Sequence, residues 1–426
     1  MRQWMVAAKK ADFYAIAEKF HVDPVVARII RNREVIGEKN IRIYLGGNLS
    51  DLSDPHQMKD MDRLVEILAQ KIRKQAHIRI IGDYDVDGVT SSHLFLTALR
   101  RVGAKVDVVI PHRIQDGYGL SLHLLQQAKE DGVDTILTCD NGIAAIDEIA
   151  WAKAQKMTVL VTDHHAVPFE EHEGRRTEKK SLADAVVNPH QQDCGYPYKE
   201  LCGAGVAWNV IRVLYENYDM DKREAEDLLD FVAMATVCDV MSLTGENRIL
   251  VKEGLKRIRH TKNIGLQALM QACNVQPENI SAYHFGYVLG PCVNATGRLD
   301  TARHALRLFE TGQETEAEEI ARDLVDLNQE RKELTLQGVE MAKKLCEEGG
   351  YENDPILVLF LPDVHESIAG LIAGRIREMY NRPVFVLTRG EEGVKGSGRS
   401  TENYSMYENM CGCAELFTKF GGHPMA

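Results

Sequence analysis

Apolar residues in the central part of the chain fall into short runs that are separated by longer, helically spaced patterns. Five runs are typical of buried strands: residues 78–81, 106–110, 135–139, 158–162 and 185–188. Helical spacing fills the intervals at about 90–102, 121–131 and 143–155. This alternation predicts an α/β fold with a parallel, doubly wound sheet, in which ligands bind beyond the carboxyl ends of the strands.

The segments on either side of this sheet have different patterns. Residues 1–76 show helical spacing over 11–27 and 58–76, which predicts an N-terminal helical segment that packs on the core. Residues 303–348 are helical throughout, with apolar positions on one face and no proline, which predicts a connector helix. We expect the sheet domain to span residues 77–302 between these two segments.

Residues 349–426 are expected to form a second, smaller α/β domain. Strand patterns at 356–361 and 384–387 flank a helical pattern at 367–380. The segment 394–400 (VKGSGRS) then places glycines around a serine and an arginine. Glycines there let backbone amides and a guanidinium approach a phosphate, although a glycine turn in a β-meander explains them equally well.

Three carboxylates follow the first strand of the sheet, at Asp83, Asp85 and Asp87. We expect the next helix to have Thr90 or Ser91 near its cap, and alternation along the extended turn to send all three carboxylates to one side. Two carboxylates at ~4 Å repel by roughly 4 kcal/mol at an effective dielectric of 20. A divalent cation with oxygen ligands, Mg²⁺ or Mn²⁺, is the simplest counter-charge. The alternative is a solvated acidic turn.

Other strand ends carry metal-binding side chains as well. Asp140 follows the third strand, His164 and His165 follow the fourth, and His190 lies just beyond the fifth. Each has an ordinary explanation, since an aspartate after a strand is often a helix cap and a histidine is often a packing residue. Because the carboxyl ends of parallel strands share one edge, the joint pattern predicts a metal site.

Composition limits the class of protein. The chain has 426 residues, 44% hydrophobic and 27% charged, with a net charge of −12. These values are ordinary for a soluble globular chain with more than one core, and they exclude a generally basic protein that coats nucleic acid. A nucleic-acid enzyme with a local groove and metal ions stays possible. The basic positions 248, 252, 256, 257 and 259 are expected to be a solvated helix face, with a nucleic-acid wall as the alternative.

The sequence predicts no membrane segment and no secretion signal. No run of ~18 apolar residues occurs, and the first residues lack an apolar signal region. The nine cysteines form no C-x-x-C pair, which indicates reduced thiols and argues against a zinc site. We therefore expect a cytoplasmic protein.

At this point the motifs resemble a known family. Residues 162–165 (TDHH) resemble the signature of the DHH phosphoesterases, 83–88 (DYDVDG) their first motif and 236–241 (TVCDVM) their fourth. Residues 111–120 and 290–299 are similar to blocks of the RecJ branch, the single-strand-specific exonucleases. The resemblance runs from about residue 78 to the last residue.

The residues and the resemblance together imply a centre of two Mn²⁺ or Mg²⁺ ions. The expected ligands are Asp83, Asp85, Asp87, Asp140, His164 and Asp239. Asp140 is expected to bridge the ions, and His165 to stabilise charge or act as an acid at the scissile phosphate, so that His165, Asp140 and Asp87 are the catalytic residues. Asp239 should end a helix over 224–238, where the helix dipole disfavours an acid without a cation. A loop carboxylate that binds nothing is the alternative.

The resemblance also implies that the second domain binds substrate across a cleft from the metals. Residues 420–426 (FGGHPMA) resemble the glycine–histidine motif of the DHH-associated domain. The expected substrate contacts are Asn294, Arg298, His365, Ser397, Gly398, Arg399, Ser400 and His423. We also expect the native chain to continue beyond residue 426, into an OB-fold.

The chain departs from the family pattern at two positions. Cys292 stands where the RecJ block has arginine, so that a phosphate contact is missing or is supplied by Arg298. Ile81 stands where some DHH relatives place a histidine ligand, and Asp83 is expected to take that metal position.

The implied function is 5′-to-3′ exonucleolytic hydrolysis of single-stranded DNA to mononucleotides, in DNA repair and recombination. The implied partners are single-strand-binding protein and a helicase. One alternative is a DHH phosphodiesterase for short oligonucleotides or cyclic dinucleotides, against which the 117–120 block and the connector argue. The other is a non-catalytic replication scaffold, against which the complete ligand set argues.

Overall fold

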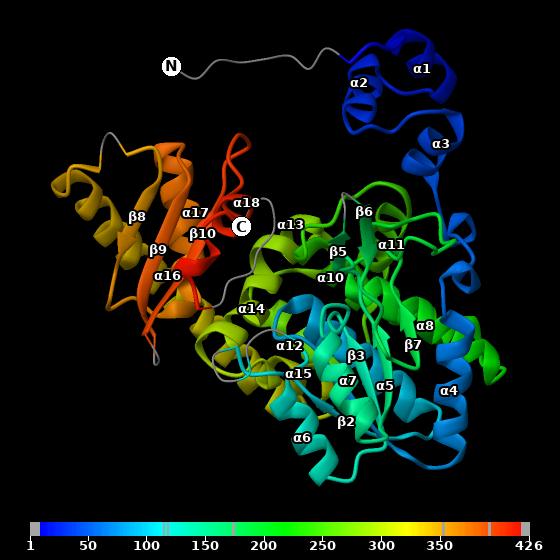
Figure 1. Cartoon of the computed structure of the whole chain (residues 1–426). Coiled ribbons are helices and arrows are strands. Elements are labelled where there is room, and N and C mark those ends of the chain that lie inside the picture. Colours follow the sequence, from blue (N-terminus) through cyan, green and yellow to red (C-terminus); the bar gives the residue numbers. More distant parts are fainter. Residues whose placement is uncertain are drawn as a thin grey trace. The chain divides into compact units, whose positions relative to one another are not determined.

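The computed structural model describes residues 9–113, 116, 119–172, 175–351, 354–390 and 393–418. The chain forms two compact units (Figure 1). Unit 1 comprises Met1–Asn294 and Ala302–Arg322, and unit 2 comprises Ala295–Thr301 and Asp323–Ala426. Each unit has a hydrophobic core of its own.

The sheet of unit 1 has five parallel strands in the order β2-β1-β3-β4-β7. Their bounds are β2 (Lys105–Val109), β1 (His77–Ile81), β3 (Thr135–Cys139), β4 (Thr158–Thr162) and β7 (Ala185–Val187). The three central strands are almost wholly buried, as their largely apolar sequences require. The predicted α/β fold with a parallel sheet is confirmed.

Helices connect the strands and cover the sheet (Figure 1). They are α5 (Val86–Arg101), α6 (Leu122–Glu130) and α7 (Ile146–Ala154). Side chains of α6 and α7 form one core with the strands, around Leu125, Ile136 and Ile149. Helix α5 packs instead against α8 (Gly203–Asn217) and α10 (Leu229–Cys238). The order of the strands places the end of β1 beside the end of β3, and β3 beside β4.

A helical region completes unit 1. Its further helices are α9 (Lys222–Glu226), α11 (Gly245–Arg257), α12 (Ile264–Ala272), α13 (Ala282–His284), α14 (Gly290–Leu299, which crosses into unit 2) and α15 (Ala302–Glu310). The short segment η5 (Phe285–Leu289) between α13 and α14 is π-helical. The expected helix over 224–238 is in fact two helices, because α9 ends before Asp227 and α10 starts at Leu229.

The N-terminal segment contains α1 (Phe13–Phe20), α2 (Pro24–Asn32), α3 (Glu38–Gly46) and α4 (Met61–Arg73). The pattern over 11–27 therefore does not form one helix. His21 ends α1 with a positive φ of 53°, and Asp23 caps a new helix that has Pro24 in its first turn. Proline fits that position because its missing N–H is not needed there.

A hairpin in unit 1 was not predicted. Strands β5 (Phe169–His172) and β6 (Arg175–Glu178) pair in antiparallel fashion. Seven of their eight residues are polar or charged, so that the apolar alternation that marks a half-buried strand is missing from this segment.

The long helical pattern after residue 302 is interrupted once. Helix α15 ends at Glu310, and α16 (Glu314–Glu348) follows after Thr311, Gly312 and Gln313. A glycine inside the pattern lowers helix propensity. Helix α16 has 35 residues, and the boundary between the units falls within it, after Arg322. The division at 77, 303 and 349 stays a prediction.

Unit 2 is built on a three-stranded sheet in the order β10-β9-β8. Strand β8 (Leu357–Phe360) runs parallel to β9 (Val384–Gly390), and β10 (Gly393–Arg399) runs antiparallel to it. Helix α17 (Ala369–Tyr380) packs on the sheet through Ile372 and Ile376. A short helix, α18 (Met406–Cys411), follows. Across the described parts of both units, every helix is too short or too polar to span a membrane.

Candidate metal centre

The acidic turn after β1 is organised by a helix cap. Asp85 is the N-cap of α5, and its Oδ1 accepts a hydrogen bond from the Gly88 amide at 3.0 Å. Helix α5 therefore starts at Val86, and the expectation of a start near Thr90 is wrong. Asp87 lies in the first helical turn, so that strand alternation does not set its direction. A capping aspartate satisfies amides that would otherwise lack a partner, which explains the early start.

Gly88 allows the turn to close tightly. A Cβ at this position would lie 2.5 Å from the backbone nitrogen and oxygen of Asp83. Only glycine therefore fits where the first turn of α5 folds back against the end of β1. This close approach brings Asp83 and Asp85 to the same side as Asp140.

Asp87 is held by a helix that starts 116 residues later in the chain. Its Oδ2 accepts a hydrogen bond from the Gly203 amide at 2.6 Å, and its Oδ1 accepts one from the Ala204 amide at 2.7 Å. These amides open α8, whose own N-cap Cys202 makes no side-chain cap. A Cβ at Gly203 would lie 2.6 Å from the Cβ of Asp140. Sequence reasoning missed this role, for which the glycines at 203 and 205 were the only signal.

Asp140 and His164 lie at the centre of the site. The Nε2 of His164 is 3.1 Å from Asp140 Oδ1, and 3.7 Å from both Asp87 Oδ2 and Asp239 Oδ2. Asp140 does not cap the next helix, because α7 starts at Ile146 after Ala145. It has a left-handed φ of 61°, a conformation that aspartate and asparagine tolerate better than most residues. The helix-cap alternative for Asp140 is therefore wrong.

The predicted ligands form three overlapping groups. Within each group the ligand atoms lie within 4.8 Å of one another: Asp83, Asp85 and Asp140; Asp87, His164 and Asp239; and Asp140, His164 and His165. Asp140 and His164 each belong to two groups. Oxygen and imidazole donors in this arrangement can hold Mn²⁺ or Mg²⁺.

The charges of the site fit bound cations. Burial, followed by the charge of Asp85, raises the pKa of Asp83. Burial and the charge of Asp87 raise the pKa of Asp140, and the same two causes raise that of Asp239 to about 8. Asp83 Oδ1 is buried and accepts no hydrogen bond from the described residues. Buried carboxylates in excess of cations are what divalent ions neutralise.

The two histidines have different environments. Burial lowers the pKa of His164, which favours the neutral imidazole that binds metals. His165 is less buried, and its Nδ1 is 2.7 Å from Asp163 Oδ1. Burial alone would lower the pKa of His165, but this hydrogen bond and the charge of Asp163 outweigh it and raise the pKa to about 9.

Asp163 holds the His165 ring and the loop around it. Its Oδ1 also accepts the backbone amides of His164 and His165, and its Oδ2 accepts the Ile143 amide at 2.9 Å. From the sequence alone, Asp163 had no assigned role beyond its place in the motif 162–165. An acidic residue next to two histidines was nevertheless a signal that it orients one of them.

The expected substrate residue Asn294, and Cys292 in the place of the family arginine, have other partners in unit 1. Asn294 Oδ1 accepts the Val86 amide at 3.1 Å, in the first turn of α5. Cys292 is buried, with its Sγ 3.3 Å from the Val288 carbonyl oxygen and 3.8 Å from Cys273 Sγ. The small, uncharged thiol therefore fits this buried position. The arginine that the family has there would bring a charge into it.

In unit 2 several expected substrate residues lie around β10. Arg399 Nη1 donates to the Gly398 carbonyl at 2.7 Å and lies 3.2 Å from Ser397 Oγ. A Cβ at Gly370 would lie 2.8 Å from both Arg399 Nη2 and Ser397 Oγ, so that a larger residue there would displace these two side chains. Burial, and then the nearby Arg377, lower the pKa of Arg399. A half-buried cation of this kind favours an anionic ligand.

The remaining expected residues of unit 2 contact other groups of the same unit. Arg298 Nη1 donates to the Ser367 carbonyl at 2.8 Å, and His365 Nδ1 is 2.7 Å from Ser367 Oγ. Ser400 is buried, and its Oγ accepts the Met406 amide at 3.0 Å. The predicted residue His423, the motif 420–426 and residues 117–118 of the RecJ block lie outside the described residues.

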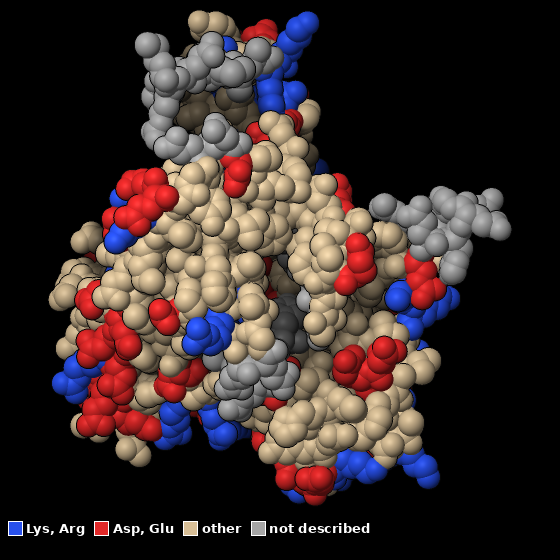
Figure 2. Space-filling view, turned by 60° about the vertical axis from the view of Figure 1, so that its left-hand side comes forward, with Lys and Arg blue, Asp and Glu red and all other residues tan. Residues whose placement is uncertain are grey.

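Most of the basic side chains of α11 contact other residues of unit 1. Arg248 stacks on Tyr44 of α3 at 3.9 Å, and Lys252 Nζ donates to the Gly47 carbonyl at 3.2 Å. Arg257 pairs with Glu226 at 2.7 Å. On the face shown in Figure 2, acidic and basic side chains are interspersed. These contacts favour the structural interpretation over a nucleic-acid wall.

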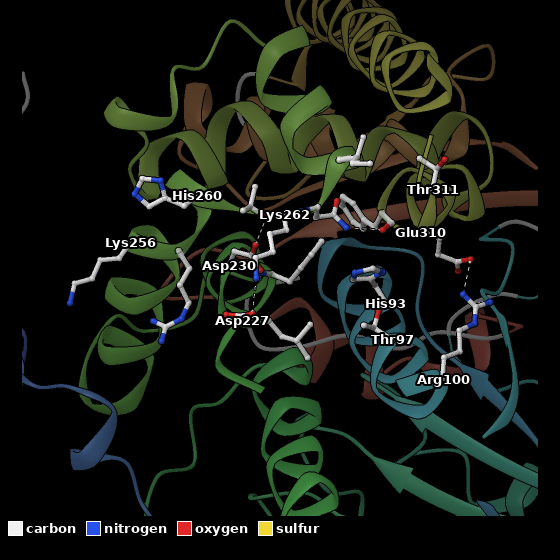
Figure 3. A pocket seen from close by; sticks show the side chains of 18 residues that line it. His93, Thr97, Arg100, Asp227, Asp230, Lys256, His260, Lys262, Glu310 and Thr311 are labelled. Atoms are coloured by element: carbon white, nitrogen blue, oxygen red, sulfur yellow. Dashed lines mark hydrogen bonds and ion pairs between the residues drawn. The ribbon is translucent and has the colours of Figure 1, made fainter. Parts of the chain in front are cut away.

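A separate cavity of about 730 Å³ lies in unit 1, away from the metal centre. Figure 3 shows His93 of α5 and Asp230 of α10 among the residues that line it, together with Arg100 and Lys262. Burial lowers the pKa of His93 to about 3 and raises that of Asp230 to about 6. None of the grouped metal-binding residues lines this cavity.

The chain matches two family models, the DHH family N-terminal domain over residues 77–236 and the DHHA1 domain over residues 353–426. It is 35% identical over 421 residues to the single-stranded-DNA-specific exonuclease RecJ of Haemophilus influenzae, covering 95% of this chain and 71% of the relative. The chain belongs to the RecJ family. The predicted resemblance is confirmed, and neither the small-substrate enzyme nor the scaffold is favoured.

Solved structures of this family agree with the fold. RecJ of Thermus thermophilus in complex with Mn²⁺ matches with a TM-score of 0.80 and 29% identity, over 97% of this chain and 57% of that chain. The Mg²⁺ complex from the same organism matches with a TM-score of 0.74 and 28% identity, over 97% and 55%. The chain thus spans little more than half of the Thermus protein. These Thermus structures hold Mn²⁺ or Mg²⁺, the same metals that the side chains of this site predict.

Proposed function

We propose that this chain is a metal-dependent exonuclease that hydrolyses single-stranded DNA in the 5′-to-3′ direction and releases mononucleotides, in DNA repair and recombination. The single observation that carries the proposal is the gathering of five carboxylates and two histidines at the strand ends of a RecJ-family chain. The RecJ relatives are named as single-stranded-DNA-specific exonucleases. The direction of digestion rests on the family resemblance alone.

Two ions, Mn²⁺ or Mg²⁺, are proposed to be held by Asp83, Asp85, Asp87, Asp140, His164 and Asp239. When bound, such ions lower the pKa of the attacking water and stabilise the charge of the transition state. Asp140 is proposed to bridge, because it belongs both to the group with Asp83 and to the group with His164. The α8 amides hold the carboxylate of Asp87 ready for binding.

His165 is proposed to act at the scissile phosphate. Because Asp163 engages its Nδ1, the ring can offer Nε2 to the substrate. A proton held at Nε2 can stabilise charge on a phosphate oxygen or pass to the leaving 3′ oxygen. Asp163 fixes the tautomer and the direction of the ring, in the way that carboxylates orient histidines at other sites.

Unit 2 is proposed to bind the substrate phosphate. The support comes from Arg399, whose guanidinium has no carboxylate partner among the described residues, and from the hydroxyl of Ser397 beside it. We include Arg298, His365, Gly398 and His423 in this proposal. The contacts of Asn294 and Ser400 inside the chain make them positioning residues, through α5 and through the turn after β10.

The test is digestion of single-stranded DNA labelled at either end, in Mn²⁺, beside a duplex and a cyclic dinucleotide. We expect mononucleotides from the 5′ label first, with the duplex intact. Asp140→Asn should strongly reduce this activity without unfolding the chain. Hydrolysis of the cyclic dinucleotide alone would contradict the proposal, and release from the 3′ label first would contradict its direction.

The cellular setting is proposed from the substrate class. Single strands arise where a helicase opens a duplex, and single-strand-binding protein covers them. We therefore propose both as partners, in the cytoplasm. Co-purification of either protein with a tagged chain after nuclease treatment would support a direct contact, and loss of both after that treatment would show that DNA alone bridges them.

A further inference from the structure

Two tyrosines in unit 1 present their rings to solvent as a stacked pair. The side chains of Tyr283 and Tyr287 are 62% and 73% exposed. Their ring centroids are 5.1 Å apart, and the ring planes differ by 25°. The ring of Tyr283 also lies nearly perpendicular to that of His284, at 5.8 Å between centroids. A pair of large aromatic side chains that stays this exposed marks a contact surface.

The pair is attached to the metal centre through the backbone that carries it. Tyr287 lies in η5, where the Phe285 carbonyl oxygen is 3.3 Å from Cys238 Sγ. Cys238 is the last residue of α10, and the proposed ligand Asp239 follows it directly. The next helix, α14, starts at Gly290 and contacts the first turn of α5 through Asn294.

The local backbone is irregular on both sides of this contact. Segment η5 is π-helical, a conformation that occurs frequently at functional sites. Val240, directly after Asp239, has a left-handed φ of 58° and is 87% exposed. A β-branched residue rarely adopts this conformation. The residue directly after the proposed ligand Asp239 is thus both strained in its backbone and apolar and exposed in its side chain.

We propose that Tyr283 and Tyr287 form a stacking subsite for the bases of single-stranded DNA. This inference rests on the proposed function and names a part of the substrate that the metal centre does not hold. Unpaired bases expose π-faces that stack on aromatic rings with little regard to sequence, whereas a duplex buries those faces. Stacking also suits a region beside clustered carboxylates, because neutral rings hold the bases without further charge.

The subsite should affect long substrates more than short ones. A single strand places bases beyond the nucleotide at the metal centre, where a platform on η5 can engage them. A 5′-phosphorylated dinucleotide has few such bases and depends mainly on the centre itself. The pair would therefore lower the KM for long strands and leave the turnover of a dinucleotide unchanged.

The test compares a Tyr283→Ala/Tyr287→Ala variant with a Tyr283→Phe/Tyr287→Phe variant. On a long single strand we expect the alanine variant to raise KM about ten-fold or more, because stacking contributes strongly for each base. The phenylalanine variant should match the wild type, since it keeps both rings. Tyr14→Ala is the control, because Tyr14 is 78% exposed on α1.

A second measurement detects stacking directly. A strand with 2-aminopurine near its 5′ end should lose fluorescence when it binds the wild type, and less when it binds the alanine variant. An unchanged KM in the alanine variant, or equal losses on the strand and the dinucleotide, would overturn the proposal. Equal damage by phenylalanine would also overturn it. If the wild type digests no single strand, the proposed function fails, while the 2-aminopurine signal still tests the subsite.

Discussion

The two ends of strand β1 handle charge in opposite ways. At its start, His77 Nε2 lies 2.9 Å from Asp107 Oδ2. Two residues further on, Arg79 donates from Nε and Nη2 to both oxygens of Asp107, at 2.8 and 2.7 Å, and from Nη1 to Asp131 at 2.8 Å. At its other end, Asp83 and Asp85 face further carboxylates. Burial alone would raise the pKa of Asp107, but Arg79 outweighs it and lowers that pKa. The pKa of Asp83 is raised.

The difference separates folding from function. At the start of β1 the chain supplies both charges, so that the contact stabilises the fold without any ligand. At the other end the chain supplies mostly one sign, and the balancing charge has to be bound from solution. In natural proteins, repulsion between like charges at a functional site is often compensated by stabilising contacts in other parts of the fold. Changes at the two ends of β1 should therefore have opposite consequences for activity and stability.

Asp140→Asn should have the largest effect. Removing the central carboxylate should lower the rate on single-stranded DNA by roughly 100- to 1,000-fold or more. Asparagine tolerates the left-handed φ of this position, so that the metal-free variant should unfold at the same temperature as the wild type or higher. Exonuclease kinetics and thermal unfolding in EDTA measure the two effects. Asp131→Asn, which weakens the contact of Asp131 with Arg79 of β1, is the control and should keep its activity.

Added Mn²⁺ should stabilise the folded protein only through the metal centre beyond the carboxyl end of β1. Free Mn²⁺ at 100 times its Kd adds about 2.7 kcal/mol to the free energy of unfolding. The wild type should therefore show a higher unfolding midpoint with Mn²⁺ than with EDTA, and Asp140→Asn a much smaller shift. Arg79→Met should retain the full shift. An equal shift in the wild type and the Asp140 variant would contradict the assignment of the site.

Arg79→Met should reduce stability and spare the chemistry. The change leaves Asp107 partly buried with only His77 beside it, and we expect a loss of about 2 kcal/mol in the free energy of unfolding. Urea unfolding measures this loss, while the rate at low temperature should stay near that of the wild type. Arg101→Met removes an exposed pair with Glu224 and should change the urea midpoint far less.

Acid should produce the smallest effect, again at the start of β1. Because the pKa of Asp107 is lowered by folding, its contribution is present above the unfolded value of 3.8 and is lost as the pH falls through the folded pKa. As the pH falls below about 4, the wild type should thus lose urea resistance more steeply than Arg79→Met. Parallel curves for the two proteins would show that the ion pair carries no such linkage.

Local patterns along the sequence were sufficient for much of the fold. The strands predicted at 135–139 and 158–162 have the same bounds as β3 and β4. They were predictable because buried parallel strands need unbroken apolar runs, whatever surrounds them. The positions of Asp140, His164 and Asp239 followed from the ends of these elements and from the family motifs. The charged hairpin β5–β6 lacked such a pattern and was missed.

The sequence by itself therefore determined which elements form and which acids and histidines stand at their ends. Only the tertiary structure decided how those side chains are held. Asp85 caps α5, the α8 amides 116 residues away bind Asp87, and Asp163 directs the ring of His165. The physical reason is range: periodicity and caps act over a few residues, whereas the geometry of a metal centre depends on contacts between segments that meet only when the sheet assembles.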